Sequence, residues 1–251
     1  MATPDTPMPV PAAEPAPIGE IGRMTGVLVN PKPTYDDIVA RPSWLAPLAL
    51  LAILSIVVIA VFGQRVGWRS LVERRLAQNP QADQMKAEDR ERALNFWSKY
   101  GTYIIGASGV FFLVLGTVIT AGVLLGVFNL IAGTRLNYKT ALAIVSFSWM
   151  PFAIHGLLSL ILLFVKSPDT IDIEHLVTSN PGAILSSDSA KWLMALLTSL
   201  DIFAFWMLVL QAIGFAAASP KKVSFAKGLS IVVIVWAIWV LIRVGWVGAF
   251  S

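Results

Sequence analysis

The 251-residue chain is 56% hydrophobic and 14% charged, with a mean hydropathy of +0.72. Because soluble domains carry about 25% charged residues, this composition argues against an ordinary soluble globular protein and indicates one that faces lipid. The net charge of +4 is spread over loops, which excludes the concentrated basic face of a nucleic-acid binder and favours contact with anionic lipids. Cysteine is absent, so disulfides, thiolate metal sites and cysteine nucleophiles are excluded.

The first 44 residues precede any apolar stretch of membrane length. Residues 1–17 hold six prolines and no apolar run, which predicts a disordered proline-rich tail and not a secretory signal. Residues 18–44 predict two short cytoplasmic juxtamembrane helices. Asn30-Pro31-Lys32-Pro33 separates them, and Thr34 is the predicted N-cap of the second.

Five long apolar stretches follow, each long enough for the about 20 helical residues that cross a hydrocarbon core. The expected fold is therefore all-α: a multi-pass bundle of five transmembrane helices that forms one membrane domain over residues 45–251. The predicted spans are Leu45–Gly63, Thr102–Gly133, Ala141–Val165, Lys191–Ala218 and Ala226–Phe250.

The loop over residues 64–100 is predicted to be extracytoplasmic and helical. Trp68, Leu71, Val72 and Leu76 recur at helical spacing with arginines beside them, which is typical of an interfacial helix lying on lipid headgroups. The densely charged stretch 83–92 predicts a solvated helix that continues into the second span.

Two features predict how the spans pack. Gly122 and Gly126, four residues apart in the second span, form a small-residue face, which we expect to pack within the chain, with dimerisation as the alternative. Pro151 cannot donate to the preceding turn, so a kink is expected near Phe147–Met150 of the third span.

The short loops predict the orientation in the membrane. Loops 133–140 and 219–227 carry lysine or arginine and no acid, whereas loop 166–191 has four acids against two basic residues. By the positive-inside rule the N-terminus and both basic loops are cytoplasmic and the C-terminus is outside. The long loop 64–99, with eight basic residues against five acids, opposes this, but short loops carry more weight.

Three ionisable residues fall inside predicted spans, where they are costly and mark a candidate site. Counted at about 1.5 Å per residue from the midpoint of each span, His155, Asp201 and Arg243 lie about 3, 5 and 8 Å toward the outer side of the membrane. The three residues are therefore at similar depths, and contacts among them are possible. The first interpretation is a structural one: the three residues form a polar or ionic cluster that fixes the register of the helices against one another. The alternatives are snorkelling of Arg243 to the outer surface and a proton or ion path through Asp201 and His155.

Motifs for catalysis are absent from the sequence. There is no phosphate loop, no dinucleotide-binding fingerprint and no H-E-x-x-H zinc motif. With two histidines and no cysteine, a zinc site would need carboxylates from distant segments. We therefore expect no catalytic residue, cofactor or metal.

Three parts of the sequence form a recognisable set: Asn30–Tyr35 with Arg41–Pro47 before the first span, Gly133–Thr140 with Trp149-Met150-Pro151 in the third, and Phe205–Gly214 with Lys221–Lys227 in the last hairpin. In these segments, and over roughly residues 18–250, the chain resembles the bacterial form of the Yip1 family of five-span membrane proteins.

This resemblance implies a non-enzymatic integral membrane protein of the bacterial inner membrane. Eukaryotic members bind Rab-type GTPases and one another and act in vesicle formation. This chain lacks their D-L-Y and G-Y motifs and has a tail of about 44 residues, which argues against GTPase binding. The expected role is that of a scaffold or interaction protein in membrane organisation or trafficking, which contacts the bilayer and a protein partner or a second copy. The alternatives are a small transporter or channel, or an accessory subunit of a larger complex.

Overall fold

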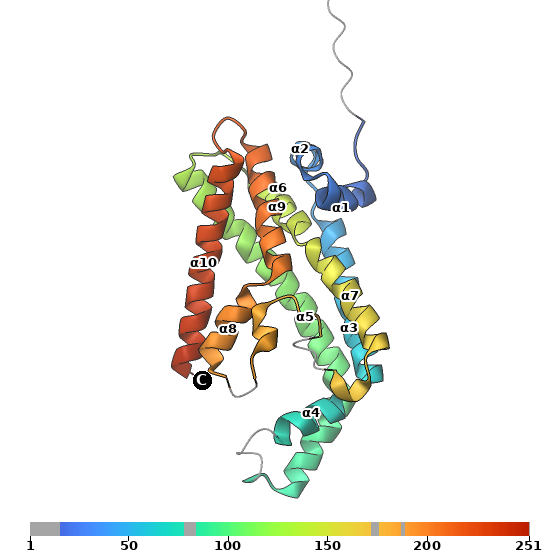
Figure 1. Ribbon diagram of the computed structural model, residues 1–251. Helices are drawn as coiled ribbons and strands as arrows, with labels where there is room; N and C mark the ends of the chain where they lie inside the picture. The colour runs from blue at the N-terminus through green and yellow to red at the C-terminus, as the bar shows by residue number, and fades with distance from the viewer. Residues whose placement is uncertain (1–15, 78–83, 172–175, 187–188, 251) are drawn as a thin grey trace, which may run out of the picture.

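The computed structural model describes residues 16–77, 84–171, 176–186 and 189–250, and in these ranges all regular secondary structure is helical (Figure 1). The predicted disordered tail lies outside the described residues except for its last two positions. The helices are α1 (Glu20–Val29), α2 (Pro31–Ala40), α3 (Leu45–Arg65), α4 (Trp68–Ala77), α5 (Ala87–Ile131), α6 (Tyr138–Ser148), α7 (Pro151–Val165), α8 (Lys191–Ser199), α9 (Ile202–Ala218) and α10 (Phe225–Phe250), with 3-10 turns η2 (Pro168–Thr170) and η3 (Pro181–Ile184).

Four segments of the described chain are long and apolar enough to cross a membrane, and a bent pair of helices raises the number to five. The four are α3, α5, the α6–α7 segment and α10. The pair is α8 and α9, which meet at 48°. An all-α, helical multi-pass protein is confirmed, but the fourth predicted span, Lys191–Ala218, is broken instead of continuous.

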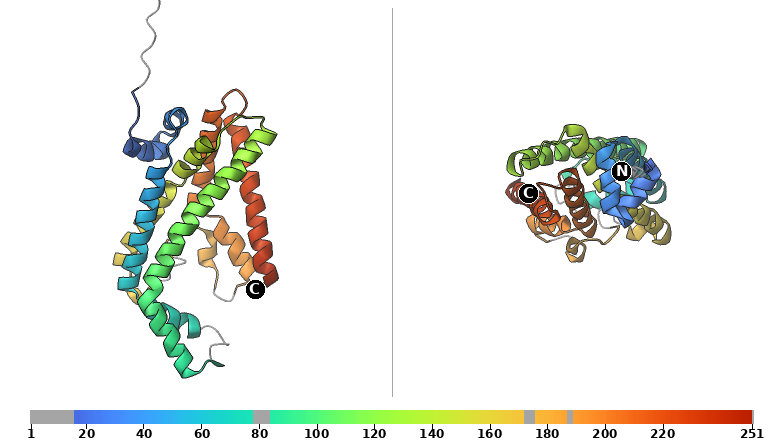
Figure 2. Two further views of the ribbon diagram at one scale, coloured as in Figure 1. Left: turned by 180° about the vertical axis from the view of Figure 1, so that it is seen from behind. Right: turned by 90° about the horizontal axis from the view of Figure 1, so that it is seen from above.

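The helices form an elongated bundle with distinct ends (Figures 1 and 2). The segments α1, α2, the α5–α6 loop and the α9–α10 turn lie at one end, while α4 and the start of α5 lie at the other. Helix α3 packs against α5 and α7, and α9 packs against α10 and α6. Both basic loops therefore share an end with the N-terminal helices, as the predicted topology requires.

Helix α5 is much longer than a membrane span. Its 45 residues correspond to about 68 Å of helix, against a hydrocarbon core of about 30 Å. Glu88 and Asp89 lie in its first turn, where the helix dipole favours acids. The predicted continuation of a charged helix into the second span is confirmed.

The proline-bearing third span breaks where it was expected to kink. Helix α6 ends at Ser148 and α7 begins with Pro151, so Trp149 and Met150 form the break. The amide of Met150 turns back to the Phe147 carbonyl at 3.2 Å, which uses the carbonyl that the proline ring leaves without its helical donor.

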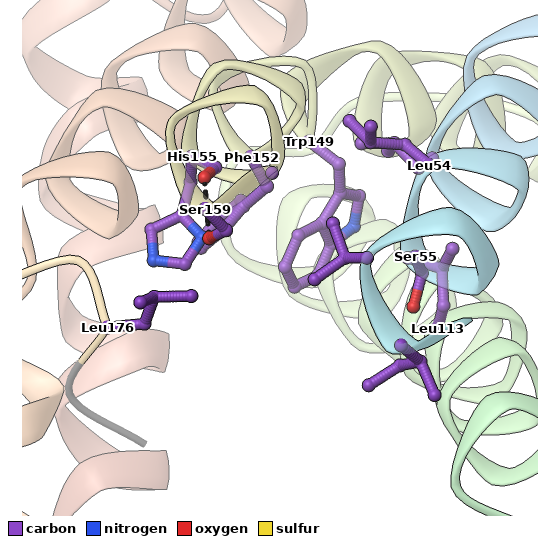
Figure 3. A pocket seen from close by; sticks show the side chains of 12 residues that line it. Leu54, Ser55, Leu113, Trp149, Phe152, His155, Ser159 and Leu176 are labelled. Carbon is purple, nitrogen blue, oxygen red and sulfur yellow. Dashed lines mark hydrogen bonds between the residues drawn. The ribbon is translucent and has the colours of Figure 1, made fainter. Parts of the chain in front are cut away.

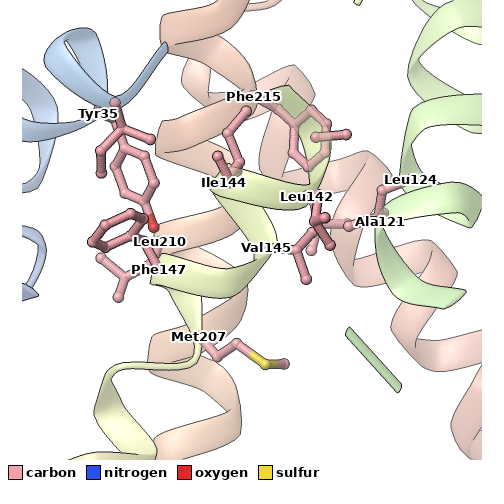
Figure 4. Packing of buried hydrophobic residues seen from close by; sticks show 14 of the residues in the cluster. Tyr35, Ala121, Leu124, Leu142, Ile144, Val145, Phe147, Met207, Leu210 and Phe215 are labelled. Carbon is pink, nitrogen blue, oxygen red and sulfur yellow. The ribbon is translucent and has the colours of Figure 1, made fainter. Parts of the chain in front are cut away.

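Helix α6 lies at the centre of the core, since every residue from Thr140 to Ser148 is buried. In Figure 4, Phe147 lies beside Tyr35 of α2, and Ile144 lies between Tyr35 and Phe215 of α9. Tyr35 is fully buried and shares a 2.7 Å hydrogen bond with Ser148. Burial raises the pKa of Tyr35, although the Ser148 bond opposes this. The juxtamembrane helix α2 is thus docked into the bundle.

A buried arginine joins the two N-terminal helices. Arg23 of α1 donates from Nε to Asp37 Oδ2 at 2.7 Å and from Nη1 to Ser43 Oγ at 2.9 Å. Burial by itself raises the pKa of Asp37, but hydrogen bonds from Arg23, the Ile18 amide and Arg41 outweigh it, so this pKa lies below its usual value. The pair holds α1 against α2.

The N-cap predicted for α2 is wrong. Helix α2 begins at Pro31, and Thr34 is a buried residue inside it that donates to the Asn30 carbonyl at 2.8 Å. Prolines are tolerated in a first turn because the amides there lack helical partners in any case.

The glycine face predicted for the second span is also wrong as an intramolecular contact. A Cβ at Gly126 would meet nothing within 4 Å, and one at Gly122 would meet only the Tyr138 ring at 4.0 Å. The buried face of α5 lies one or two residues away, at Ala121, Leu124 and Phe128. Phe128 stacks on Phe215 of α9 with ring centroids 4.2 Å apart.

Helices approach each other closely at other glycines, which are not part of the Gly122 and Gly126 pair. A Cβ at Gly214 of α9 would clash with Ile144 and lie 2.9 Å from the Tyr35 ring. A Cβ at Gly101 of α5 would lie 2.5 Å from Trp68 Cγ. These positions need glycine because a neighbouring side chain fills the space of a Cβ.

Candidate functional site

The break between α8 and α9 is built around Asp201. Its Oδ1 accepts the amides of Phe203 at 2.8 Å and Ala204 at 3.2 Å, which caps the N-terminus of α9. Its Oδ2 accepts the hydroxyl of Ser179, and the Ser179 carbonyl accepts the Ile202 amide at 3.1 Å. An aspartate that bonds to nearby backbone amides competes with helix continuation, and this accounts for the break.

Arg243 of α10 reaches the other side of the break. It donates to Ser199 Oγ at 2.9 Å and to Thr198 Oγ1 at 3.4 Å, and its guanidinium lies 5.8 Å from the Trp239 ring centroid. Both hydroxyls belong to the last turn of α8, where the helix dipole favours a cation. Asp201 and Arg243 therefore do not pair: Asp201 caps the start of α9, and Arg243 binds the end of α8. These bonds place the guanidinium against the end of α8, and snorkelling of Arg243 to the outer surface stays an alternative.

His155 of α7 is the third member of the predicted cluster. Its ring meets Phe203, at the start of α9, edge to face with centroids 5.3 Å apart, and it lies within electrostatic reach of Asp201. The three residues thus gather around the break, but in the described part of the chain no hydrogen bond or ion pair joins them to one another.

A cavity of about 320 Å³ adjoins His155 between α3, α5 and α7 (Figure 3). In the figure, His155 and Ser159 of α7 lie opposite Leu54 and Ser55 of α3. The Nε1 of Trp149 is buried and has no hydrogen-bond partner in the described structure. The other lining residues are mainly aliphatic or aromatic: Leu51, Val58, Ile59, Leu113, Phe152, Gly156 and Leu176. An apolar chamber of this kind does not supply the polar lining that a water-filled ion path needs.

The loop that enters the break was not anticipated. Residues 176–186 fold back against α8, and a Cβ at Gly182 would lie 3.2 Å from the Thr198 amide. Leu176 is buried in the core, and its carbonyl accepts the Lys166 amine at 3.4 Å. No periodicity or motif marks Ser179 as the partner of Asp201, since the two lie 22 positions apart.

Helix α4 forms as predicted, but its first residue faces protein. An interfacial helix would turn its apolar side to lipid, whereas Trp68 is 5% exposed and donates from Nε1 to Thr102 Oγ1 at 2.7 Å. Its ring lies 5.1 Å from that of Phe62. The other members of the predicted face, Leu71, Val72 and Leu76, are half-buried. Placement of α4 on the headgroups stays a prediction.

Ion pairs also tie α4 to α5. Arg69 binds Glu91 at 3.0 Å and Glu73 at 3.0 Å, and the hydrogen bond from Arg69 holds the pKa of Glu91 below its usual value. Elsewhere, no three His, Asp or Glu side chains gather closely enough for a metal ion within the described ranges.

The family of the chain follows from comparison with known proteins. The model of the Yip1 domain matches residues 25–247, which extends from α1 to α10. The chain belongs to the Yip1 family. No curated protein and no solved structure matches it. Yip1-domain membership and the apolar helices together identify a multi-pass membrane protein, from a family not known as enzymatic.

Proposed function

We propose that this Yip1-family protein is a non-enzymatic membrane scaffold that holds a protein partner or a second copy of itself at the bilayer. The supporting observation is that the charged groups at the break between α8 and α9 are bonded within the protein. Asp201 accepts three hydrogen bonds and Arg243 donates two. A solute could use these groups only by displacing bonds that maintain the helix ends.

One observation favours the transporter alternative. Discontinuous membrane helices often form substrate or ion sites, because their ends present unpaired amides and carbonyls. Here α8 and α9 meet at such a discontinuity, with His155 beside it. The cavity next to His155 is apolar, however, and the amides of Phe203 and Ala204 are already capped. An accessory role in a larger complex is compatible with the scaffold proposal.

The proposed location is a bacterial inner membrane, with the α1–α2 end in the cytoplasm and the C-terminus outside. The positive-inside rule supports it, because the basic loops 133–140 and 219–227 share an end with α1 and α2 (Figure 1). Binding to GTPases is not part of the proposal.

Reconstitution separates the two functions. Purified wild-type protein and Asp201→Asn are placed in vesicles that report proton and cation flux. We expect both to match protein-free vesicles. Flux through the wild type that Asp201→Asn abolishes would overturn the scaffold proposal.

Photo-crosslinking in native membranes tests the scaffold directly. The reactive residue is placed at Ile21, which is 76% exposed on α1, with Leu241 on the outer surface of α10 as the lipid-facing control. We expect one recurrent protein adduct at Ile21 and lipid adducts at Leu241. Lipid adducts alone at both positions would contradict a protein-binding role for the α1 face.

A further inference from the structure

A second cavity lies at the end of the bundle that carries α1 and α2. It has a volume of about 530 Å³ and opens between α2 and the turn that joins α9 to α10. This volume is within the about 300–1,000 Å³ usual for small-molecule sites. We call it the α2–α9 groove, and its lining residues are Lys32, Asp36, Ile213, Ala216, Ala217, Pro220, Val223 and Phe225.

The groove lies where apolar helix gives way to polar loop. Its apolar wall comes from the last two turns of α9, which ends at Ala218, and from Phe225, which begins α10. In a membrane-spanning bundle this level is the boundary between hydrocarbon and headgroups. A molecule bound here would have one part among aliphatic side chains and another among polar groups.

The facing wall is held in place by the core. Lys32 and Asp36 lie one helical turn apart on α2, and the same helix is docked by Tyr35. The Tyr35 ring packs so closely on α9 that a Cβ at Gly214 would lie 2.9 Å from it. The groove is therefore a preformed feature between two fixed elements.

Lysines occur on both elements that bound the polar side of the groove, α2 and the α9–α10 turn. Lys32 is exposed and has no ion-pair partner among the described residues. Lys222 donates to the Gly133 carbonyl of the α5–α6 loop, and Lys227 donates to the Lys222 carbonyl on the α9–α10 turn. The charged residues that line the groove are Lys32 and Asp36, and the adjoining α9–α10 turn adds Lys221, Lys222 and Lys227 without an acid.

We propose that the α2–α9 groove binds one phospholipid with an anionic headgroup. An acyl chain lies along Ile213, Ala217 and Phe225, and the headgroup phosphate lies at Lys32, beside the lysine-bearing turn. The apolar wall argues against a simple phosphate site, and the excess of lysine on the neighbouring α9–α10 turn favours a headgroup with net negative charge. The site does not depend on whether the protein scaffolds a partner or moves a solute.

The test measures lipids retained by the purified full-length protein. The protein is equilibrated in micelles with equal amounts of phosphatidylglycerol and phosphatidylcholine, and bound lipids are counted by native mass spectrometry. We expect wild type to retain one phosphatidylglycerol in preference to phosphatidylcholine. Lys32→Glu should weaken retention of phosphatidylglycerol by about tenfold, because it reverses a charge at the headgroup.

Two further variants separate charge from shape. Lys86→Glu makes the same charge change at an exposed lysine before α5, at the opposite end of the bundle, and should leave retention unchanged. Ala217→Trp fills the groove and should reduce retention of both lipids. If Ala217→Trp fails to fold, the exposed pair Lys32→Glu and Lys86→Glu still decides the outcome.

Three results would overturn the proposal. The wild type could retain phosphatidylglycerol and phosphatidylcholine equally, or Lys32→Glu and Lys86→Glu could have the same effect on phosphatidylglycerol retention. The third result is that the number of bound lipids per protein rises beyond one without saturating.

Discussion

The role assigned to Asp201 makes a distinctive prediction about two substitutions at that position. Asp201→Ala removes the side chain that caps α9 and accepts the Ser179 hydroxyl. Asp201→Asn keeps an oxygen for the two amides and a polar group facing Ser179. If the residue is a structural cap, alanine is damaging and asparagine is nearly neutral.

The magnitude follows from the bonds lost. Replacing an N-cap aspartate by alanine costs about 1 kcal/mol, and losing the hydrogen bond with Ser179 costs about another 1 kcal/mol. Asp201→Ala should thus lower the free energy of unfolding by about 2 kcal/mol, which is about 4–8 °C in Tm for a chain of this size. Asparagine caps helices about as well as aspartate, so its cost should stay below about 1 kcal/mol.

The assay is thermal unfolding of the purified protein in detergent, followed by helical circular dichroism. Asp169→Ala is the matched control, because Asp169 is exposed on η2 and its removal should change stability by less than about 0.5 kcal/mol. An Asp201→Ala variant as stable as Asp169→Ala would refute the capping argument.

Three more predictions concern packing and pH. Gly214→Ala should destabilise the protein by about 1–2 kcal/mol through overpacking, whereas Gly126→Ala should be neutral or stabilising by up to about 1 kcal/mol, both measured by unfolding in mixed micelles. Trp68→Phe should cost about 1–2 kcal/mol and speed hydrogen exchange in α4, because the bond to Thr102 is lost. The stabilising effect of Asp37 should be complete above its unfolded pKa of about 3.9 and should disappear as pH falls through its lower folded value. Hydrogen exchange in α1 should therefore accelerate in that acid range.

Each of these has an outcome that would contradict it. Equal effects of alanine at Gly214 and Gly126 would mean that the second glycine packs as tightly as the first. Unchanged exchange in α4 of Trp68→Phe would show that the indole bond does not hold this helix. Exchange in α1 that stays constant through the acid range would remove the Asp37 pair as the link between α1 and α2.

Much of the architecture could be predicted from the sequence because a bilayer restricts backbone structure. Polar backbone groups in hydrocarbon must be bonded within the segment, so a long apolar stretch becomes a helix. This reasoning located α3, α5 and α10 to within a few residues at most ends, and it placed the third-span break at Pro151. The sequence also predicted that the two basic loops lie at the same end of the bundle. Successive spans cross the membrane in opposite directions, so every second loop is on the same side.

The candidate site was harder to predict, because its geometry depends on partners distant in the chain. His155, Asp201 and Arg243 were recognised from their cost in a membrane, and they do gather at one level. His155 contacts the ring of Phe203, Asp201 accepts from Ser179 and Arg243 donates to Ser199, and no pattern in the sequence distinguishes these partners.

The sequence by itself determined the helical class, the apolar segments, the proline break and the relative sidedness of the loops, because these follow from local chemistry in a bilayer. The tertiary structure alone decided which faces of the helices meet. Lipid-facing and protein-facing surfaces are equally apolar, so hydrophobicity could not show that Trp68 is buried, that Gly126 is open, or that Tyr35 docks α2 into the core. Those contacts depend on shape and close approach, which exist only once the helices are packed.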